Sequence, residues 1–161
     1  MSLPNSEILE VSKQFGIRCQ IAIPVMNELN SDSNINKSLN RLLELHDELK
    51  HHSLITIAFG IQGPNSLSPQ GAEKTAVLAN EIQIPIQIIY ESSFILDKHK
   101  SGWSKQKSWL NQLEQLGALG PHVQLVQMDH LKENELELIQ NTRSKIIHFA
   151  SSALELSLIH I

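Results

Sequence analysis

Five short apolar runs, rich in β-branched residues, recur along the 161-residue chain and constrain its fold more than any other feature. The runs cover residues 17–25, 54–59, 84–90, 122–128 and 145–150. The stretches before and between them place apolar residues, mostly leucine and isoleucine, at every third or fourth position, which is the spacing of amphipathic helices. We expect these helices within residues 5–16, 36–52, 68–82, 104–117 and 132–142. Near-continuous apolar strands that alternate with helices predict an α/β fold with a parallel sheet.

Two architectures fit this alternation: part of a (β/α)8 barrel, or an open doubly wound sheet. No glycine-rich phosphate loop follows any of the five runs, because the glycines of residues 59–63 (FGIQG) have the wrong spacing for a dinucleotide fingerprint. Ser68 and Pro69 predict a helix start, Gly16 predicts a helix end, and residues 30–36 are the most loop-like stretch. In a barrel, we expect the apolar side chains of residues 21–25, 55–59 and 146–150 to pack in layers inside it.

Composition excludes several classes of partner. A net charge of −4 gives no basic surface for nucleic acid. No apolar run approaches the ~20 residues of a membrane-spanning helix, and residues 1–11 lack the pattern of a signal peptide. The single cysteine, Cys19, lies in an apolar run and is expected to be a small core residue. One thiol forms no intramolecular disulfide, which predicts a cytoplasmic location.

Polar residues gather where the predicted strands end, and parallel α/β folds place their sites at this end of the sheet. Asp129 and His130 form the sharpest polar pair, which fits either acid–base chemistry or a solvated turn before the next helix. A catalytic zinc site takes about three protein ligands, and the sequence contains no HxH, HExxH or CxxC motif. We therefore assign no metal ligand and no catalytic residue. The candidates for a substrate pocket are Gln62, Glu91, Ser92, Gln127, Asp129, His130 and His148.

Five segments covering almost the whole chain carry a family resemblance: residues 16–25, 43–59, 79–93, 113–139 and 145–156. In order and spacing they resemble the amidohydrolase superfamily, and most closely its chlorohydrolases and the deaminases related to methylthioadenosine/S-adenosylhomocysteine deaminase. The resemblance implies a partial (β/α)8 TIM barrel containing about strands three to seven. It also implies a family reaction in which zinc or iron supports hydrolysis of C–N or C–Cl bonds on purine-like or triazine-like rings.

The residues that carry this chemistry in the family are mostly replaced here. The resemblance places Gln62 at the family's substrate-binding histidine and Ile89 at its metal-binding histidine. It places Ser92 at the catalytic glutamate and Gln127 at a further histidine, whereas His148 matches. The family's first-strand HxH and eighth-strand aspartate would lie outside the chain. The resemblance therefore implies the fold, while the replacements predict a chain without a metal cofactor.

Our leading hypothesis is a fragment of a divergent amidohydrolase-like barrel that is catalytically inactive on its own and binds a small purine-like or heterocyclic ligand. Such a fragment is expected to need the missing strands or to self-associate, and to be prone to aggregation. The alternatives are part of an active metal-dependent hydrolase acting on C–N bonds, and a non-catalytic ligand-binding α/β module. We expect the barrel segment to span residues 1–155. Residues 156–161 (LSLIHI) match the translation of a common sequencing-library transposon end, although a chance apolar tail is the alternative.

Overall fold

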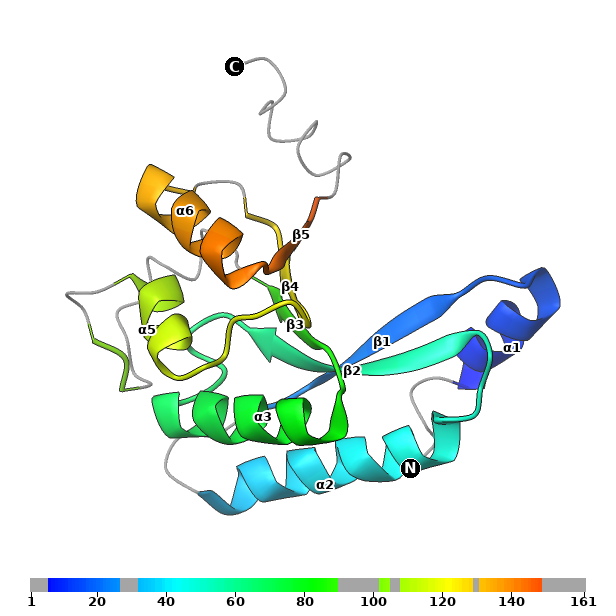
Figure 1. The fold of residues 1–161 in the computed structure, drawn as a ribbon. Coiled ribbons are helices and arrows are strands. Elements are labelled where there is room, and N and C mark those ends of the chain that lie inside the picture. The colour runs from blue at the N-terminus through cyan, green and yellow to red at the C-terminus, as the bar shows by residue number, and fades with distance from the viewer. Residues whose placement is uncertain (1–5, 27–31, 90–101, 105–107, 129–130, 149–161) are drawn as a thin grey trace.

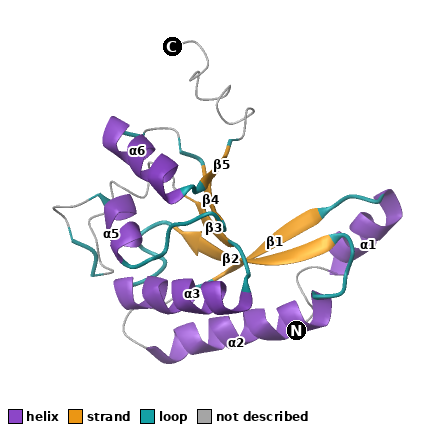
Figure 2. Cartoon of the chain, viewed as in Figure 1, coloured by secondary structure: helices purple, strands orange, loops and turns teal. Residues whose placement is uncertain are grey.

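Helices and strands alternate along the whole described part of the chain, as the sequence predicts (Figures 1 and 2). The computed structural model describes residues 6–26, 32–89, 102–104, 108–128 and 131–148. The helices are α1 (Ser6–Phe15), α2 (Asp32–Leu49), α3 (Pro69–Ile82), α5 (Trp109–Gln115) and α6 (Glu133–Thr142). The strands are β1 (Cys19–Pro24), β2 (Ile55–Gln62), β3 (Ile86–Ile89), β4 (Val123–Val126) and β5 (Lys145–Ile147).

The five strands form one sheet in which every neighbouring pair is parallel and the spatial order is β1-β2-β3-β4-β5. A doubly wound sheet reverses its strand order at a switch point, whereas a barrel keeps its strands in chain order. Right-handed crossovers between strands in chain order place the helices on the same face of the sheet. Figure 1 shows α2, α3, α5 and α6 along one side of the sheet. The topology therefore matches part of a barrel.

The main core lies between the sheet and these helices. Side chains point alternately to the two faces of a strand. On β2, Ile57, Phe59 and Ile61 face the helices and are at most 4% exposed. The helices contribute apolar side chains to the same cluster, among them Leu42 of α2 and Leu110 of α5, both fully buried. This layer is apolar and mostly aliphatic, as expected for a sheet face that helices cover.

The other face of the sheet differs from our expectation of layered apolar side chains. We call it the inner face. Strand register places on it Gln20, Ala22, Pro24, Thr56, Ala58, Gly60, Gln62, Gln87, Ile89, Gln124, Val126, Lys145 and Ile147. On β1 and β2 these residues are small or polar, because the large aliphatic side chains of the same strands alternate onto the helix side. The prediction of an aliphatic interior is therefore wrong for β1 and β2. It holds at Ile147 on β5.

Local sequence signals set several boundaries. Ser68 caps α3, its hydroxyl accepting a hydrogen bond from the Gly71 amide at 3.1 Å, and Pro69 is the first helical residue. Gly16 follows α1 with a φ of 65°, a conformation that glycine adopts without strain. Helix α2 begins at Asp32, so the expectation of a loop through residue 36 is wrong. Asp, Ser and Asn favour loops and also the cap and first turn of a helix, so their presence does not distinguish a loop from the start of a helix.

Two further features bear on the compositional predictions. The Cys19 thiol is only half-buried and accepts a hydrogen bond from the Ser12 hydroxyl at 3.2 Å, so Cys19 lies at the border of the core rather than within it. Within the described residues, none of the helices combines the length and the apolar character that crossing a membrane requires.

Candidate functional site

The candidate site lies at the carboxyl ends of the strands. There, one row of residues crosses four strands of the inner face: Gln62 of β2 pairs with Ile89 of β3, Ile89 with Val126 of β4, and Val126 with Ile147 of β5. We call these four residues the tip row. Paired residues on parallel strands point to the same face, so the tip row is one continuous strip of side chains.

Gln62 ends β2 and begins a tight turn. Its backbone amide donates to the Ser66 hydroxyl at 3.1 Å, and that hydroxyl donates to the Gly63 carbonyl at 3.0 Å. The Gly63 amide donates to the Ile89 carbonyl at 3.0 Å, which joins the turn to β3. The Gln62 side chain is exposed, so its amide group is available to a ligand as both donor and acceptor.

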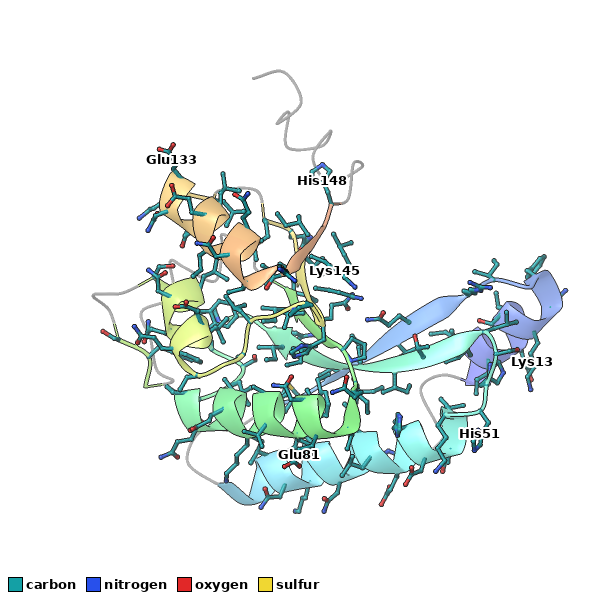
Figure 3. All side chains as sticks on the ribbon, in the orientation of Figure 1. Lys13, His51, Glu81, Glu133, Lys145 and His148 are labelled. Carbon is teal, nitrogen blue, oxygen red and sulfur yellow. The ribbon has the colours of Figure 1, made fainter. Side chains whose placement is uncertain are left out.

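Two other predicted pocket residues lie immediately beyond strand ends. Gln127 follows β4, is half-buried and has a φ of 59°, which turns the chain at this point. His148 follows β5 and is exposed; Figure 3 shows it just after the end of the strand, with Lys145 at the strand's beginning. Gln62, Gln127 and His148 therefore share one end of the sheet. Whether their side chains line one pocket stays a prediction.

The remaining pocket candidates are Glu91, Ser92, Asp129 and His130, and they lie outside the described residues. The same holds for the tail predicted at residues 156–161. Their assignments stay predictions from the sequence.

The chemistry of the tip row does not suit a metal ion. A catalytic zinc site is built from imidazole, thiolate and carboxylate ligands. The tip row offers three aliphatic side chains and the Gln62 amide, which is a poor zinc ligand. Across the described part of the chain, no group of three or more His, Cys, Asp or Glu side chains is placed to hold a metal. Within the described part of the chain, the residues at this end of the sheet therefore do not fit the family's metal centre.

Side-chain bonds fix the loops around this end of the sheet. The indole of Trp103, 4% exposed, donates to the Leu67 carbonyl at 2.8 Å and so ties the β3–α5 connection to the β2–α3 loop. Its ring lies edge-on to Trp109, with the ring centroids 6.0 Å apart. The Ser108 hydroxyl, at the start of α5, donates to the carboxylate of Glu135 in α6, which is 3% exposed. The rim of the site is therefore tied together by buried side chains.

Sequence reasoning missed part of this arrangement. It singled out Gln62 and Ile89 but not Val126 and Ile147, which complete the tip row. The signal available was the two-residue alternation counted backward from each strand end. This alternation is hard to recognise because the residues that precede Val126 and Ile147 are also apolar.

Comparison with known proteins supports the fold described above and the family resemblance found in the sequence. Over 144 residues the chain is 31% identical to the 5-methylthioadenosine/S-adenosylhomocysteine deaminase of Saccharophagus degradans, covering 88% of this chain and 32% of that protein. No protein-family model matches the chain. The chain spans about a third of the length of the curated relatives it matches.

Two solved structures have a similar fold. An adenosine deaminase from Xanthomonas campestris with bound zinc matches with a TM-score of 0.78 and 22% identity, over 98% of this chain and 36% of that one. The atrazine chlorohydrolase of Arthrobacter aurescens complexed with zinc matches with a TM-score of 0.75 and 18% identity, over 93% of this chain and 35% of that one. The same conclusion follows from the parallel sheet, from the order of its strands and from the similarity to these proteins. The chain belongs to the amidohydrolase superfamily.

Proposed function

We propose that this chain is part of a divergent amidohydrolase-superfamily protein that binds a small purine-like or triazine-like ring without hydrolysing it. The observation that carries this proposal is Ile89 at the end of β3, in register with Val126 and Ile147. The family resemblance assigns this position to a metal-binding histidine, and an isoleucine side chain has no atom that coordinates a metal. Without a bound metal, no water at the site has its pKa lowered toward neutrality, so the hydroxide nucleophile of the family reaction is lost.

Ring binding is the part of the family's behaviour that the remaining side chains support. Gln62 ends β2 and Gln127 follows β4, so the two lie at the same end of the sheet with β3 between their strands, and a glutamine amide can both donate and accept hydrogen bonds. Similar proteins are named as deaminases and as an atrazine chlorohydrolase, which act on or bind nitrogen-containing rings. Fold alone does not transfer function, so the ligand class needs a direct test.

The test separates binding, metal content and turnover on the 161-residue chain. Isothermal titration with adenine and hypoxanthine should show binding, whereas elemental analysis after growth in zinc-supplemented medium should show substoichiometric zinc. Methylthioadenosine incubated with the protein and added zinc should keep its adenine absorbance spectrum. One equivalent of zinc that survives dialysis and is lost in His148→Ala, together with deamination, would establish the alternative of an active hydrolase.

The proposal also covers the association of this chain with other strands and its location in the cell. Within the described residues, the two edge strands, β1 and β5, each pair with one neighbouring strand and have no strand on their outer side. Unpaired edge strands favour pairing with further strands, so we propose that the chain associates with additional barrel strands or with itself. Size-exclusion chromatography coupled to light scattering tests this association, and a monodisperse monomer would contradict it. The cytoplasmic location rests on the single thiol and stays a prediction.

A further inference from the structure

A hollow lies at the amino end of the sheet, the end opposite the tip row. It has a volume of about 290 Å³ and is found where β1 and β2 begin. We call it the amino-end hollow, and its lining residues are Arg18, Cys19, Gln20, Ser53, Leu54 and Thr56. None of these residues is acidic, and they supply a guanidinium, an amide and two hydroxyls as hydrogen-bond donors.

Strand register explains why these donors lie together. Gln20 pairs with Thr56, so their side chains point to the inner face from neighbouring strands about 4.8 Å apart. Arg18 lies two residues before Gln20, about 7 Å nearer the amino end, and lines the same hollow. Ser53 lies just before β2. Two chain segments that are distant in sequence therefore bring their donors to one space.

Most of these donors are not used within the protein. Among the described residues, the Arg18 guanidinium has no ion-pair partner, and the Ser53 and Thr56 hydroxyls make no side-chain hydrogen bond. All three side chains are exposed, so a ligand has only to replace water. Gln20 differs, because reciprocal hydrogen bonds with Gln124 hold its amide as a fixed wall of the hollow.

The charge that acts on a ligand comes chiefly from Arg18. The charged side chains near this end are mixed in sign: Figure 3 shows Lys13 and His51 here, while Asp47 and Lys50 pair at 3.2 Å and offset each other. Among the lining residues, Arg18 is the one that carries a charge. An anion in the hollow would therefore meet an unpaired guanidinium and no lining carboxylate.

We infer that the amino-end hollow binds a tetrahedral oxyanion, either free phosphate or the phosphate group of a small ester. A guanidinium fork binds phosphate or carboxylate through two N–H donors. The two hydroxyls donate from the other chain segment, which suits the several directions of phosphate oxygens better than the two coplanar oxygens of a carboxylate. Liquid water takes about 30 Å³ per molecule, so the hollow has room for an organic group beside the phosphate. This inference is independent of the proposed function, which concerns the opposite end of the sheet.

Phosphorus NMR of the 161-residue chain titrated with glycerol 3-phosphate tests the site. The resonance should shift and broaden with the unmodified chain, and the affinity should fall roughly tenfold or more in Arg18→Gln, because a charged hydrogen-bond donor is lost. Arg41→Gln is the matched control: it removes the same charge from an exposed position on α2 that does not line the hollow. Thr56→Val removes one hydroxyl and keeps the side-chain shape, so it should weaken binding by a few-fold.

The outcomes separate the sources of the ligand and the ways in which the inference fails. Binding of glycerol 3-phosphate more tightly than inorganic phosphate supports the ester, and equal binding supports free phosphate. Binding of neither probe overturns the inference and leaves the proposed ring binding untouched. Equal affinity in Arg18→Gln also overturns it, because the anion then lies elsewhere. Acetate that binds as tightly as phosphate overturns the tetrahedral assignment.

Thermal melting shows whether each variant is folded. If Arg18→Gln does not fold, Arg18→Lys makes the comparison instead, since it keeps the charge but lacks the planar fork. Its affinity should then be several-fold below that of the unmodified chain, and an unchanged affinity would contradict bidentate binding by Arg18.

Discussion

Reciprocal hydrogen bonds between two glutamines join strands that are not neighbours. The Gln20 amide nitrogen donates to the Gln124 side-chain oxygen at 2.8 Å, and the Gln124 nitrogen donates back to Gln20 at 3.1 Å. Gln20 lies on β1 and Gln124 on β4, three strand intervals apart. In a flat sheet these strands would be about 14 Å apart with side chains perpendicular to the sheet. The bonds therefore require a sheet that curls toward its inner face, and we expect them to stabilise that curvature.

The magnitude follows from the number and environment of these bonds. A neutral hydrogen bond contributes about 0.5–1.5 kcal/mol net, and exposure to water favours the lower end of that range. Because both bonds are exposed, the pair should contribute about 1 kcal/mol of coupling. Methionine matches glutamine in length without donating an N–H, so Gln20→Met and Gln124→Met remove the bonds with little change in volume. Water can hydrate the amide that remains in each single variant, so neither should suffer a large additional penalty.

Urea unfolding of the unmodified chain, both single variants and the double variant yields the coupling free energy directly. With an m-value of about 1–3 kcal/mol/M, each single variant should shift the midpoint by roughly 0.3–1 M. The matched control is Gln87→Met, which lies beside Gln124 on the inner face but outside the reciprocal pair. Measurements at two protein concentrations separate unfolding from association. A coupling free energy below about 0.3 kcal/mol would refute the claim that this pair stabilises the curvature.

Three further predictions test other parts of the fold. Burial lowers the pKa of His122, and its Nε2 atom has no hydrogen-bond partner among the described residues. The contribution of the neutral imidazole to the free energy of unfolding should therefore be fully present above pH ~6.5. It should fall below that pH, because the unfolded chain takes up the proton more readily than the folded one. Urea midpoints at several pH values should show this slope, and His122→Asn should flatten it. Glu135→Ala should lower the free energy of unfolding by about 1–3 kcal/mol, measured by urea unfolding, and by more than Ser108→Ala, because the buried carboxylate also accepts a backbone N–H at 3.0 Å. Trp103→Phe should lower the free energy of unfolding by about 1–2 kcal/mol in the same assay, because an aromatic ring is kept but the Leu67 carbonyl loses its buried donor. An unchanged midpoint would show that this hydrogen bond is not needed to anchor the loop.

The sequence predicted the fold class because its apolar runs are spaced by helices of the length that parallel crossovers need. The same pattern left the barrel and the doubly wound sheet open, because both use identical units. Strand order decides between them, and order depends on pairing between strands that local sequence does not encode. The inner face was also mispredicted. The runs around Gln20 and Gln124 are apolar on average, so only strict counting of alternate positions shows that these glutamines share one face.

The rule that sites lie at the carboxyl ends of strands singled out Gln62, Gln127 and His148, and the structure places all three at one end of the sheet. That they form a site stays a prediction. The aliphatic part of the tip row could not be predicted, because it depends on the register that aligns Val126 with both Ile89 and Ile147. A shift of one residue in any of these strands would turn its member of the tip row to the helix side.

The register also explains how this fold can keep its stability while its site changes. Ile88 and Leu125 are fully buried against the helices, and truncating such residues costs about 2–5 kcal/mol each. Ile89, the next residue after Ile88, points to the other face and is only half-buried, so its identity contributes less to the core. An isoleucine there adds apolar burial to the tip row, whereas an imidazole would need a metal or a hydrogen-bond partner. Exchange of a ligand position for an aliphatic residue is therefore compatible with the fold, and under the proposed function it would replace metal binding by apolar contact.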